Sequence, residues 1–144
     1  MQVKPFILCV DDEQIIIDSL SNQLRNHFGD SVEIEVASSG IEALDVIEDY
    51  VIEHGRAPNL VISDQIMPQM KGDELLRVIN EKHPETVKIL LTGQADKDDV
   101  IQAVNKGNLF KYIEKPWDFK ELLKIIEEAF KYYSSHNKSS KELD

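Results

Sequence analysis

Short apolar segments and stretches of helical periodicity alternate five times along this sequence, and this alternation limits the folds that the chain can adopt. Three of the apolar segments are almost continuously apolar, whereas residues 32–36 and 109–113 alternate between apolar and polar side chains. The five predicted strands cover residues 6–10, 32–36, 60–62, 87–91 and 109–113. Because a helix is expected after each strand, consecutive strands must run parallel, so the pattern predicts an α/β domain with helices on both faces of one parallel sheet.

The predicted helices have apolar faces and, in two cases, recognisable start signals. The first helix is expected over residues 13–28 because its large apolar side chains recur at helical spacing. Ser39 with Glu42, and Asp118 with Glu121, have the spacing of a capping box, which marks a helix start. Gly55 is expected to end the second helix, and His83-Pro84 the third. The fourth helix is expected over residues 96–106, and the fifth is expected to end at residue 133.

The strand patterns also predict the order of the sheet. A strand buried on both faces is continuously apolar, whereas an edge strand keeps polar side chains on its exposed face. Residues 32–36 and 109–113 are therefore expected at the two edges. An order of 2-1-3-4-5 places them there, and this is the flavodoxin-like doubly wound arrangement of five strand–helix units.

Length and charge exclude several classes of protein. The chain has 144 residues, and 16 Lys and Arg against 27 Asp and Glu give a net charge of −11. One domain accounts for this length, which we expect to cover residues 1–133, with residues 134–144 as a polar tail or truncated linker. The acidic excess argues against direct binding of nucleic acid or of an anionic membrane. A single cysteine, Cys9, rules out an internal disulfide, and with no secretory signal pattern we expect a cytoplasmic protein.

Polar side chains follow four of the five predicted strands. Asp11 and Asp12 end the first strand, Asp64 the third, Thr92 the fourth and Lys115 the fifth. In a doubly wound sheet, ligands bind beyond the carboxyl ends of the strands, so we expect these five side chains to lie together. Three carboxylates in one pocket repel one another unless a cation compensates, and Mg²⁺ is the ion that suits oxygen ligands of this kind, with Mn²⁺ as an alternative.

The same residue types suit phosphoryl chemistry. An ionised aspartate can attack phosphorus and form an aspartyl phosphate. Lys115 and the cation would offset negative charge on the transferred phosphoryl group, and the Thr92 hydroxyl can donate a hydrogen bond to one of its oxygens.

Four motifs in the expected order resemble the receiver domain of bacterial two-component response regulators. They are Val10-Asp11-Asp12-Glu13, the segment from Asp64 to Gly72, Leu91-Thr92-Gly93, and the segment from Tyr112 to Trp117. The resemblance covers about residues 4–133 and implies a signalling switch rather than an enzyme with an exogenous substrate.

The resemblance also implies a role for each matching residue. Asp64 corresponds to the phosphoacceptor, while Asp11, Asp12, Asp64 and the backbone carbonyl of Ile66 correspond to the Mg²⁺ ligands. Thr92 and Lys115 correspond to the pair that contacts the phosphoryl oxygens, and Lys115-Pro116 to a peptide bond that is cis in this family.

Tyr112 corresponds to an aromatic switch residue that turns inward when Thr92 moves toward the phosphate. The implied partners are a sensor histidine kinase as phosphodonor and a downstream protein or fused output domain. A homodimer through the fourth helix, fifth strand and fifth helix is a further expectation. None of the four histidines is expected to be a phosphodonor, because all fall near element ends or in the tail: His27, His54, His83 and His136.

Two other functions remain as alternatives at this stage. A phosphohydrolase of the haloacid dehalogenase type also uses an aspartate nucleophile, Mg²⁺ and a lysine on a parallel sheet. Such enzymes usually have a second aspartate two positions after the nucleophile, where this chain has Ile66. A flavodoxin-like nucleotide or flavin binder would need a phosphate-binding loop after the first strand, but the acidic segment 11–14 stands there.

Overall fold

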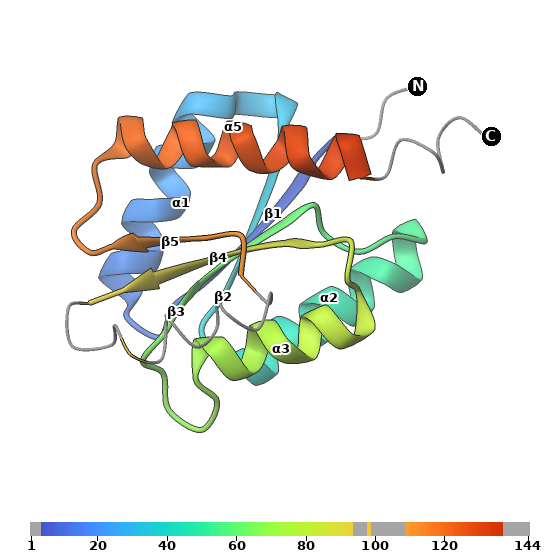
Figure 1. Cartoon of the computed structure of the whole chain (residues 1–144), viewed down its shortest axis with the longest axis horizontal. Helices are drawn as coiled ribbons and strands as arrows, with labels where there is room; N and C mark the ends of the chain where they lie inside the picture. The colour runs from blue at the N-terminus through green and yellow to red at the C-terminus, as the bar shows by residue number, and fades with distance from the viewer. Residues whose placement is uncertain (1–3, 94–97, 99–108, 137–144) are drawn as a thin grey trace.

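A computed structural model describes residues 4–93, 98 and 109–136 of the chain. Five parallel strands form one sheet in the order β2-β1-β3-β4-β5, which confirms the predicted order (Figure 1). The strands are β1 (Phe6–Val10), β2 (Glu33–Ala37), β3 (Leu60–Asp64), β4 (Val87–Thr92) and β5 (Lys111–Glu114). The strands that alternate in sequence, β2 and β5, are the two edges, whereas every residue of β1, β3 and β4 is buried.

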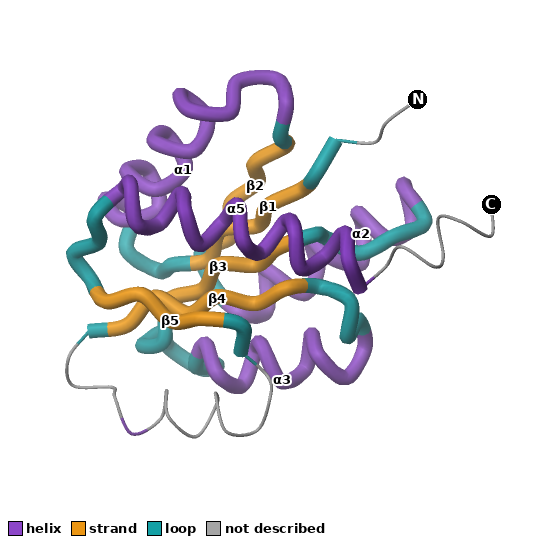
Figure 2. The backbone as a smooth tube through the Cα atoms, turned by 45° about the horizontal axis from the view of Figure 1, so that its top comes forward, coloured by secondary structure: helices purple, strands orange, loops and turns teal. Residues whose placement is uncertain are grey.

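Helices cover both faces of the sheet (Figures 1 and 2). They are α1 (Gln14–Phe28), α2 (Gly40–His54), α3 (Gly72–Lys82) and α5 (Phe119–His136), with a short 3₁₀ turn at Gly29–Ser31. Helices α1 and α5 pack on one face and α2 and α3 on the other. None of the helices in the described ranges is long and apolar enough to cross a membrane.

Alternation along the central strands divides the core into two layers. In β1, Phe6, Leu8 and Val10 point into the layer beneath α2 and α3, while Ile7 and Cys9 point into the layer beneath α1 and α5. Burial raises the pKa of the Cys9 thiol to about 12, so Cys9 is a small buried apolar residue, as its position in an apolar segment predicts. Both faces of the central strands are packed against helices. The carboxyl ends of these strands can therefore hold the side chains of a site in fixed positions.

The predicted helix starts are confirmed, but each capping box is only half formed. The Ser39 hydroxyl accepts the Glu42 N–H at 3.1 Å, whereas the Glu42 carboxylate accepts from the Ser38 hydroxyl instead of returning to Ser39. At α5, the Asp118 carboxylate accepts the Lys120 N–H at 3.3 Å. Gly55 ends α2 in the left-handed conformation with φ of 73°, as its position after the last periodic residue predicts.

Several limits differ from the sequence predictions by a few residues. The strand predicted at 109–113 begins only at Lys111, and β2 is displaced by one residue. Helix α5 continues to His136, three residues into the predicted tail, because the His136 ring stacks on Tyr132 at 3.7 Å and its Nδ1 lies 2.9 Å from the Tyr132 carbonyl. The helix predicted at 96–106 lies outside the described residues, apart from Asp98.

Candidate functional site

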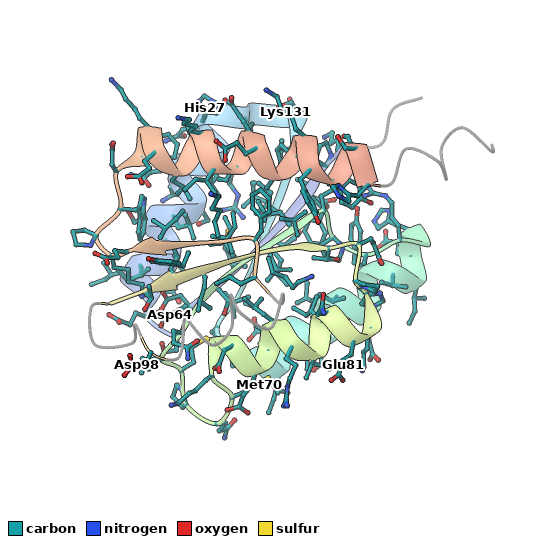
Figure 3. All side chains as sticks on the ribbon, in the orientation of Figure 1. His27, Asp64, Met70, Glu81, Asp98 and Lys131 are labelled. Atoms are coloured by element: carbon teal, nitrogen blue, oxygen red, sulfur yellow. The ribbon has the colours of Figure 1, made fainter. Side chains whose placement is uncertain are left out.

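The first and third strands place two buried carboxylates at the same edge of the sheet. Asp11 directly follows β1, and Asp64 is the last residue of β3, the neighbour of β1. Figure 3 shows Asp64 at the end of the sheet toward which the strand arrows point. Asp11 is 1% exposed and Asp64 5% exposed, although aspartate is rarely buried in proteins unless it has a partner.

Asp12 completes a group of three carboxylates. One oxygen from each of Asp11, Asp12 and Asp64 lies within 4.8 Å of the other two. Asp12 is exposed, so the group is open to solvent on one side and closed by the sheet on the other. The predicted convergence of these three side chains is confirmed.

Lys115 brings a positive charge to the two buried carboxylates. Its Nζ atom lies 2.8 Å from Asp64 Oδ1 and 2.9 Å from Asp11 Oδ2. The Lys115-Pro116 peptide bond is cis, as the resemblance implies. The Lys115 backbone N–H donates to the Thr92 carbonyl at 2.9 Å, which fixes its backbone at the end of β4. Its side chain reaches past β4 to the carboxylates at the ends of β1 and β3.

The burial of this ion pair changes the acidity of both partners. Burial is the largest influence on the Asp64 carboxyl and raises its pKa; the hydrogen bond from Lys115 opposes this increase, and the charge of Asp11 adds to it. Burial would lower the pKa of Lys115, but the hydrogen bonds and charges of Asp64 and Asp11 outweigh it and raise that pKa. Lys115 is thus held as a cation, while Asp64 is a carboxylate whose negative charge is poorly compensated by one ammonium.

This donor set fits a divalent cation that prefers oxygen ligands. Three carboxylates share one small volume, and a single ammonium serves two of them, so negative charge is in excess. Ile66 lies two residues after Asp64, and among the described residues no backbone hydrogen bond ends on its carbonyl oxygen. Carboxylate oxygens and one backbone carbonyl are ligands that Mg²⁺ accepts.

Thr92 is brought to the same edge, whereas Tyr112 is not. Thr92 is the last residue of β4, and its neighbour Leu91 pairs with Asp64 across the strands. The Thr92 hydroxyl is buried and donates to the Gly93 carbonyl at 2.9 Å. Tyr112 lies in β5, two residues before its last residue, and its side chain is 45% exposed.

Gln65 belongs to the site but was not predicted from the sequence. It directly follows Asp64, is fully buried, and bonds through its side chain to Asp73 at the start of α3. The only signal in the sequence was its place beside the phosphoacceptor candidate, since a glutamine after a strand usually faces solvent. Its partner is eight residues away across a loop, a separation that no helical or strand periodicity indicates.

A comparison with known protein families finds a match over most of the chain. The family described as "Response regulator receiver domain" matches residues 7–127, which include all the candidate site residues.

Individual proteins similar to this chain agree with that match. The hydrogenase transcriptional regulatory protein HoxA of Cupriavidus necator is 31% identical over 85% of this chain, and the DNA-binding transcriptional regulator NtrC of Escherichia coli is 30% identical over 86%. A crystal structure of the signal receiver domain of an HD domain-containing protein from Pseudomonas fluorescens Pf-5 superimposes with a TM-score of 0.84. It is 32% identical, and the match covers 96% of this chain and 95% of that one.

The regulators are much longer than this chain. The match covers 23% of the HoxA protein and 24% of the NtrC protein, so the chain spans about a quarter of these relatives. The similarity to them therefore concerns one domain of each and not the whole protein.

Proposed function

This chain belongs to the response regulator receiver family, and from that membership we propose that Asp64 is the residue that accepts the phosphoryl group. The observation that carries the proposal is the position of Asp64: a buried carboxylate at the carboxyl end of β3, 2.8 Å from the Lys115 ammonium and beside Asp11 and Asp12. A carboxylate attacks phosphorus only as the anion, and the Lys115 hydrogen bond favours that form. The domain thus acts as a signalling switch that is set by phosphorylation.

Three of the described residues would each have a separate role in phosphoryl transfer. Asp64 supplies the attacking oxygen. Lys115, which already touches this carboxylate, offsets negative charge on the incoming phosphoryl oxygens, and the Thr92 hydroxyl donates to one of them after leaving the Gly93 carbonyl. Stabilising charge in this way is the main contribution that a protein makes to phosphoryl transfer.

Asp11, Asp12, Asp64 and the Ile66 carbonyl would hold Mg²⁺, or Mn²⁺ in its place. When bound, the cation would supply positive charge that offsets the negative charge of the carboxylates and of the phosphoryl group. The excess of carboxylates over cationic side chains supports this assignment.

Tyr112 and Thr92 would transmit the phosphorylation to the surface. Tyr112 is 45% exposed and lines a cavity of about 490 Å³ together with Trp117 and Asp118. We propose that movement of Thr92 toward the phosphate lets the Tyr112 ring turn inward and changes this cavity. The surface of β5 and α5 is then the region where a downstream protein, an output domain or a second copy of the domain would bind.

A sensor histidine kinase is the proposed phosphodonor. Exposed apolar side chains lie close in sequence to the site residues: Ile15 is 82% exposed and Ile66 51% exposed, and Pro116 and Trp117 line a groove of about 440 Å³ with Lys115 and residues of α1. Exposed apolar side chains around a polar site are typical of a surface that docks another protein. The only tryptophan of the chain lies in this groove, where its indole N–H donates to Gln23 at 2.8 Å.

The relatives suggest an output but do not define one. The HoxA and NtrC proteins are described as transcriptional regulators, and this chain resembles one domain of each. We propose that the domain controls an output located elsewhere, in the same polypeptide or in a partner, and does not itself contact nucleic acid. The same proposal places it in the cytoplasm, where an unpaired cysteine such as Cys9 stays reduced.

The phosphohydrolase alternative is not favoured. The family match covers the whole candidate site, and the position two residues after Asp64, where a hydrolase would have an acid–base aspartate, is Ile66 with a half-exposed apolar side chain. The flavin alternative is weakened by the acidic group itself, because carboxylates at the end of β1 repel a phosphate in the absence of a cation.

Phosphorylation by a small phosphodonor tests the proposal. With Mg²⁺ and acetyl phosphate, intact mass spectrometry should detect one added phosphoryl group on the wild-type chain and none on Asp64→Asn. Asp30→Asn, which removes an exposed carboxylate far from the site in sequence, should behave as the wild type. A wild-type chain that stays unmodified, or an Asp64→Asn variant that is modified equally well, would contradict the assignment.

A further inference from the structure

The side chain of Gln65 forms an unusual pair with Asp73. The amide nitrogen donates to Asp73 Oδ1 at 2.9 Å, and the amide oxygen accepts the Asp73 backbone N–H at 2.9 Å. Gln65 is 0% exposed and Asp73 is half-buried, so the glutamine amide is out of contact with solvent and would be destabilising without these two bonds. The amide nitrogen and the amide oxygen of Gln65 therefore both bond to Asp73, which lies eight positions further along the chain.

This pair caps α3 from outside the helix. The first N–H groups of a helix have no partner within it, and a side-chain oxygen just before the helix usually satisfies one of them. The residue before α3 is Lys71, whose side chain has no oxygen and makes no capping bond. Gln65 provides the missing acceptor from the end of β3, which ties the start of α3 directly to the residue after Asp64.

The backbone of Gln65 is fixed as firmly as its side chain. Its N–H donates to the Leu91 carbonyl of β4 at 3.1 Å, and its carbonyl accepts the Gly72 N–H at 3.0 Å. Gly72 also passes so close to β3 that a Cβ atom there would meet the Asp64 carbonyl oxygen at 2.2 Å. Gln65, Gly72 and Asp73 thus close the base of the loop 66–71, which begins with the proposed metal ligand Ile66.

We propose that Gln65 is a positioning residue, which through its two side-chain bonds to Asp73 fixes the Ile66 carbonyl relative to the Asp64 carboxylate. This inference rests on the proposed function, because both groups matter only if they share a cation. Mg²⁺ demands near-ideal octahedral geometry, so a small displacement of one ligand weakens binding strongly. Residues that orient metal ligands without touching the metal typically change its affinity by about 10- to 100-fold when they are replaced.

The pair can be broken by Gln65→Met, or exchanged by Gln65→Glu together with Asp73→Asn, at the net charge of the wild type, whereas Gln65→Glu alone adds one negative charge. Gln65→Glu leaves the Asp73 N–H with an acceptor but places two carboxylates against each other. Adding Asp73→Asn restores both bonds, because the asparagine amide then donates to the glutamate carboxylate. Gln65→Met removes both bonds with a side chain of similar length. Gln14→Met is the matched control, since it removes the exposed 2.7 Å bond from Gln14 to Asp18 on α1.

Mg²⁺ affinity by isothermal titration calorimetry is the main measurement, with the rate of phosphorylation by acetyl phosphate measured over a range of Mg²⁺ concentrations. We expect Gln65→Glu and Gln65→Met to weaken Mg²⁺ binding by about 10- to 100-fold, the double variant to recover most of the loss, and Gln14→Met to match the wild type. In the metal-free protein, amide hydrogen exchange at Asp73 should be faster in Gln65→Met, which leaves that N–H without its acceptor, and as slow in the double variant as in the wild type.

The outcomes separate the inference from the proposed function. If the wild type binds Mg²⁺ and is phosphorylated, but the Gln65 variants bind Mg²⁺ as tightly and lose only stability to urea, the glutamine is merely structural and the inference is wrong. If the double variant binds Mg²⁺ as weakly as Gln65→Glu, the inference is also wrong. If the wild type itself neither binds Mg²⁺ nor accepts a phosphoryl group, the proposed function fails, and the inference with it.

Discussion

The Nζ atom of Lys115 lies 2.8 Å from Asp64 Oδ1, so the last residue of β3 and the residue after β5 form an ion pair across the end of β4. The same ammonium reaches Asp11 at 2.9 Å. One lysine therefore compensates two buried carboxylates, and it occupies oxygens that the proposed cation would also need. This shared use of Asp64 and Asp11 leads to a prediction about competition.

Lys115→Met should destabilise the metal-free protein and increase the stabilisation by Mg²⁺. Removing one partner of a buried ion pair costs about 3–5 kcal/mol, and the partial exposure of Lys115 reduces this to about 2 kcal/mol. The vacated carboxylate oxygens are then fully available to the cation, so Mg²⁺ should bind the variant more tightly and restore most of the loss. Urea unfolding with and without Mg²⁺ measures both effects.

The control for this prediction is Lys124→Met, which removes an exposed lysine from α5. It should change neither stability nor the effect of Mg²⁺ by more than about 0.5 kcal/mol. If Lys115→Met gains no more from Mg²⁺ than the wild type does, the lysine and the cation do not compete for the same oxygens.

Gly72→Ala should be more harmful than Gly55→Ala. The added Cβ at position 72 meets the Asp64 carbonyl oxygen at 2.2 Å, so β3 or α3 must move. At Gly55, which has the left-handed conformation with φ of 73°, a Cβ meets nothing within 4 Å and the substitution has only a backbone penalty of about 1–2 kcal/mol. We expect Gly72→Ala to lose about 1–3 kcal/mol more than Gly55→Ala in urea unfolding, and to be phosphorylated more slowly. Equal losses in the two variants would show that the close approach to Asp64 is unimportant.

Hydrophobic periodicity alone predicted the sheet and its strand order. A strand buried on both faces is continuously apolar, whereas a strand buried on one face alternates between apolar and polar residues. The continuous apolar segments became β1, β3 and β4, and the alternating ones became the edges β2 and β5. Asp11, Asp64 and Lys115 could be expected to meet because parallel strands end at a common edge. What each residue does at that edge came from the resemblance to a family, since geometry alone does not distinguish a phosphoacceptor from another buried aspartate.

The contacts that sequence patterns missed depend on pairings between distant loops or on side-chain direction. Gln65 and Asp73 meet because a loop folds back on itself, and no periodic signal records such a contact. Lys88 is a similar case: it lies within an apolar segment and is 5% exposed, with its Nζ donating to the Thr86 carbonyl. A lysine in a strand is usually expected to reach solvent, but neighbouring side chains cover this one.

Lys88→Met should stabilise the protein at neutral pH, and the gain should disappear at high pH. Burial lowers the pKa of Lys88 from 10.5 to about 8, an effect partly opposed by the charge of Glu85. Below pH 8 the folded protein must hold a buried ammonium, which costs up to about 3 kcal/mol. Between pH 8 and 10.5 the folded lysine is neutral while the unfolded one still binds a proton, so the stability of the wild type rises with pH relative to the variant.

The loss of the hydrogen bond to Thr86 offsets about 1 kcal/mol of that gain, so we expect a net stabilisation of about 1–2 kcal/mol at pH 7. Urea unfolding of both proteins from pH 6.5 to pH 10 measures the difference. Lys124→Met should show no such dependence on pH, because its side chain is exposed. A Lys88→Met variant whose advantage stays constant across this range would mean that Lys88 titrates normally in the folded protein.

Two isoleucines of equal exposure provide a test of the proposed docking surface. Ile15 on α1 is 82% exposed, and its neighbour Ile16 lines the groove of Pro116 and Trp117 beside Lys115; Ile52 on α2 is 83% exposed and lies on the opposite face of the sheet. If a kinase docks around the site, Ile15→Asp should reduce phosphorylation by a phosphohistidine-bearing kinase domain. Loss of one well-packed interface side chain costs about 1–2 kcal/mol, or about tenfold in rate at low concentrations of kinase.

Phosphorylation by acetyl phosphate separates docking from chemistry, because this small donor does not need the apolar surface. The ratio of the kinase-driven rate to the acetyl phosphate-driven rate should therefore fall about tenfold in Ile15→Asp and stay at the wild-type value in Ile52→Asp. The two substitutions add the same charge at equal exposure, so a general effect of charge or solubility would change both ratios alike. Equal ratios in both variants would place the kinase contact elsewhere on the domain.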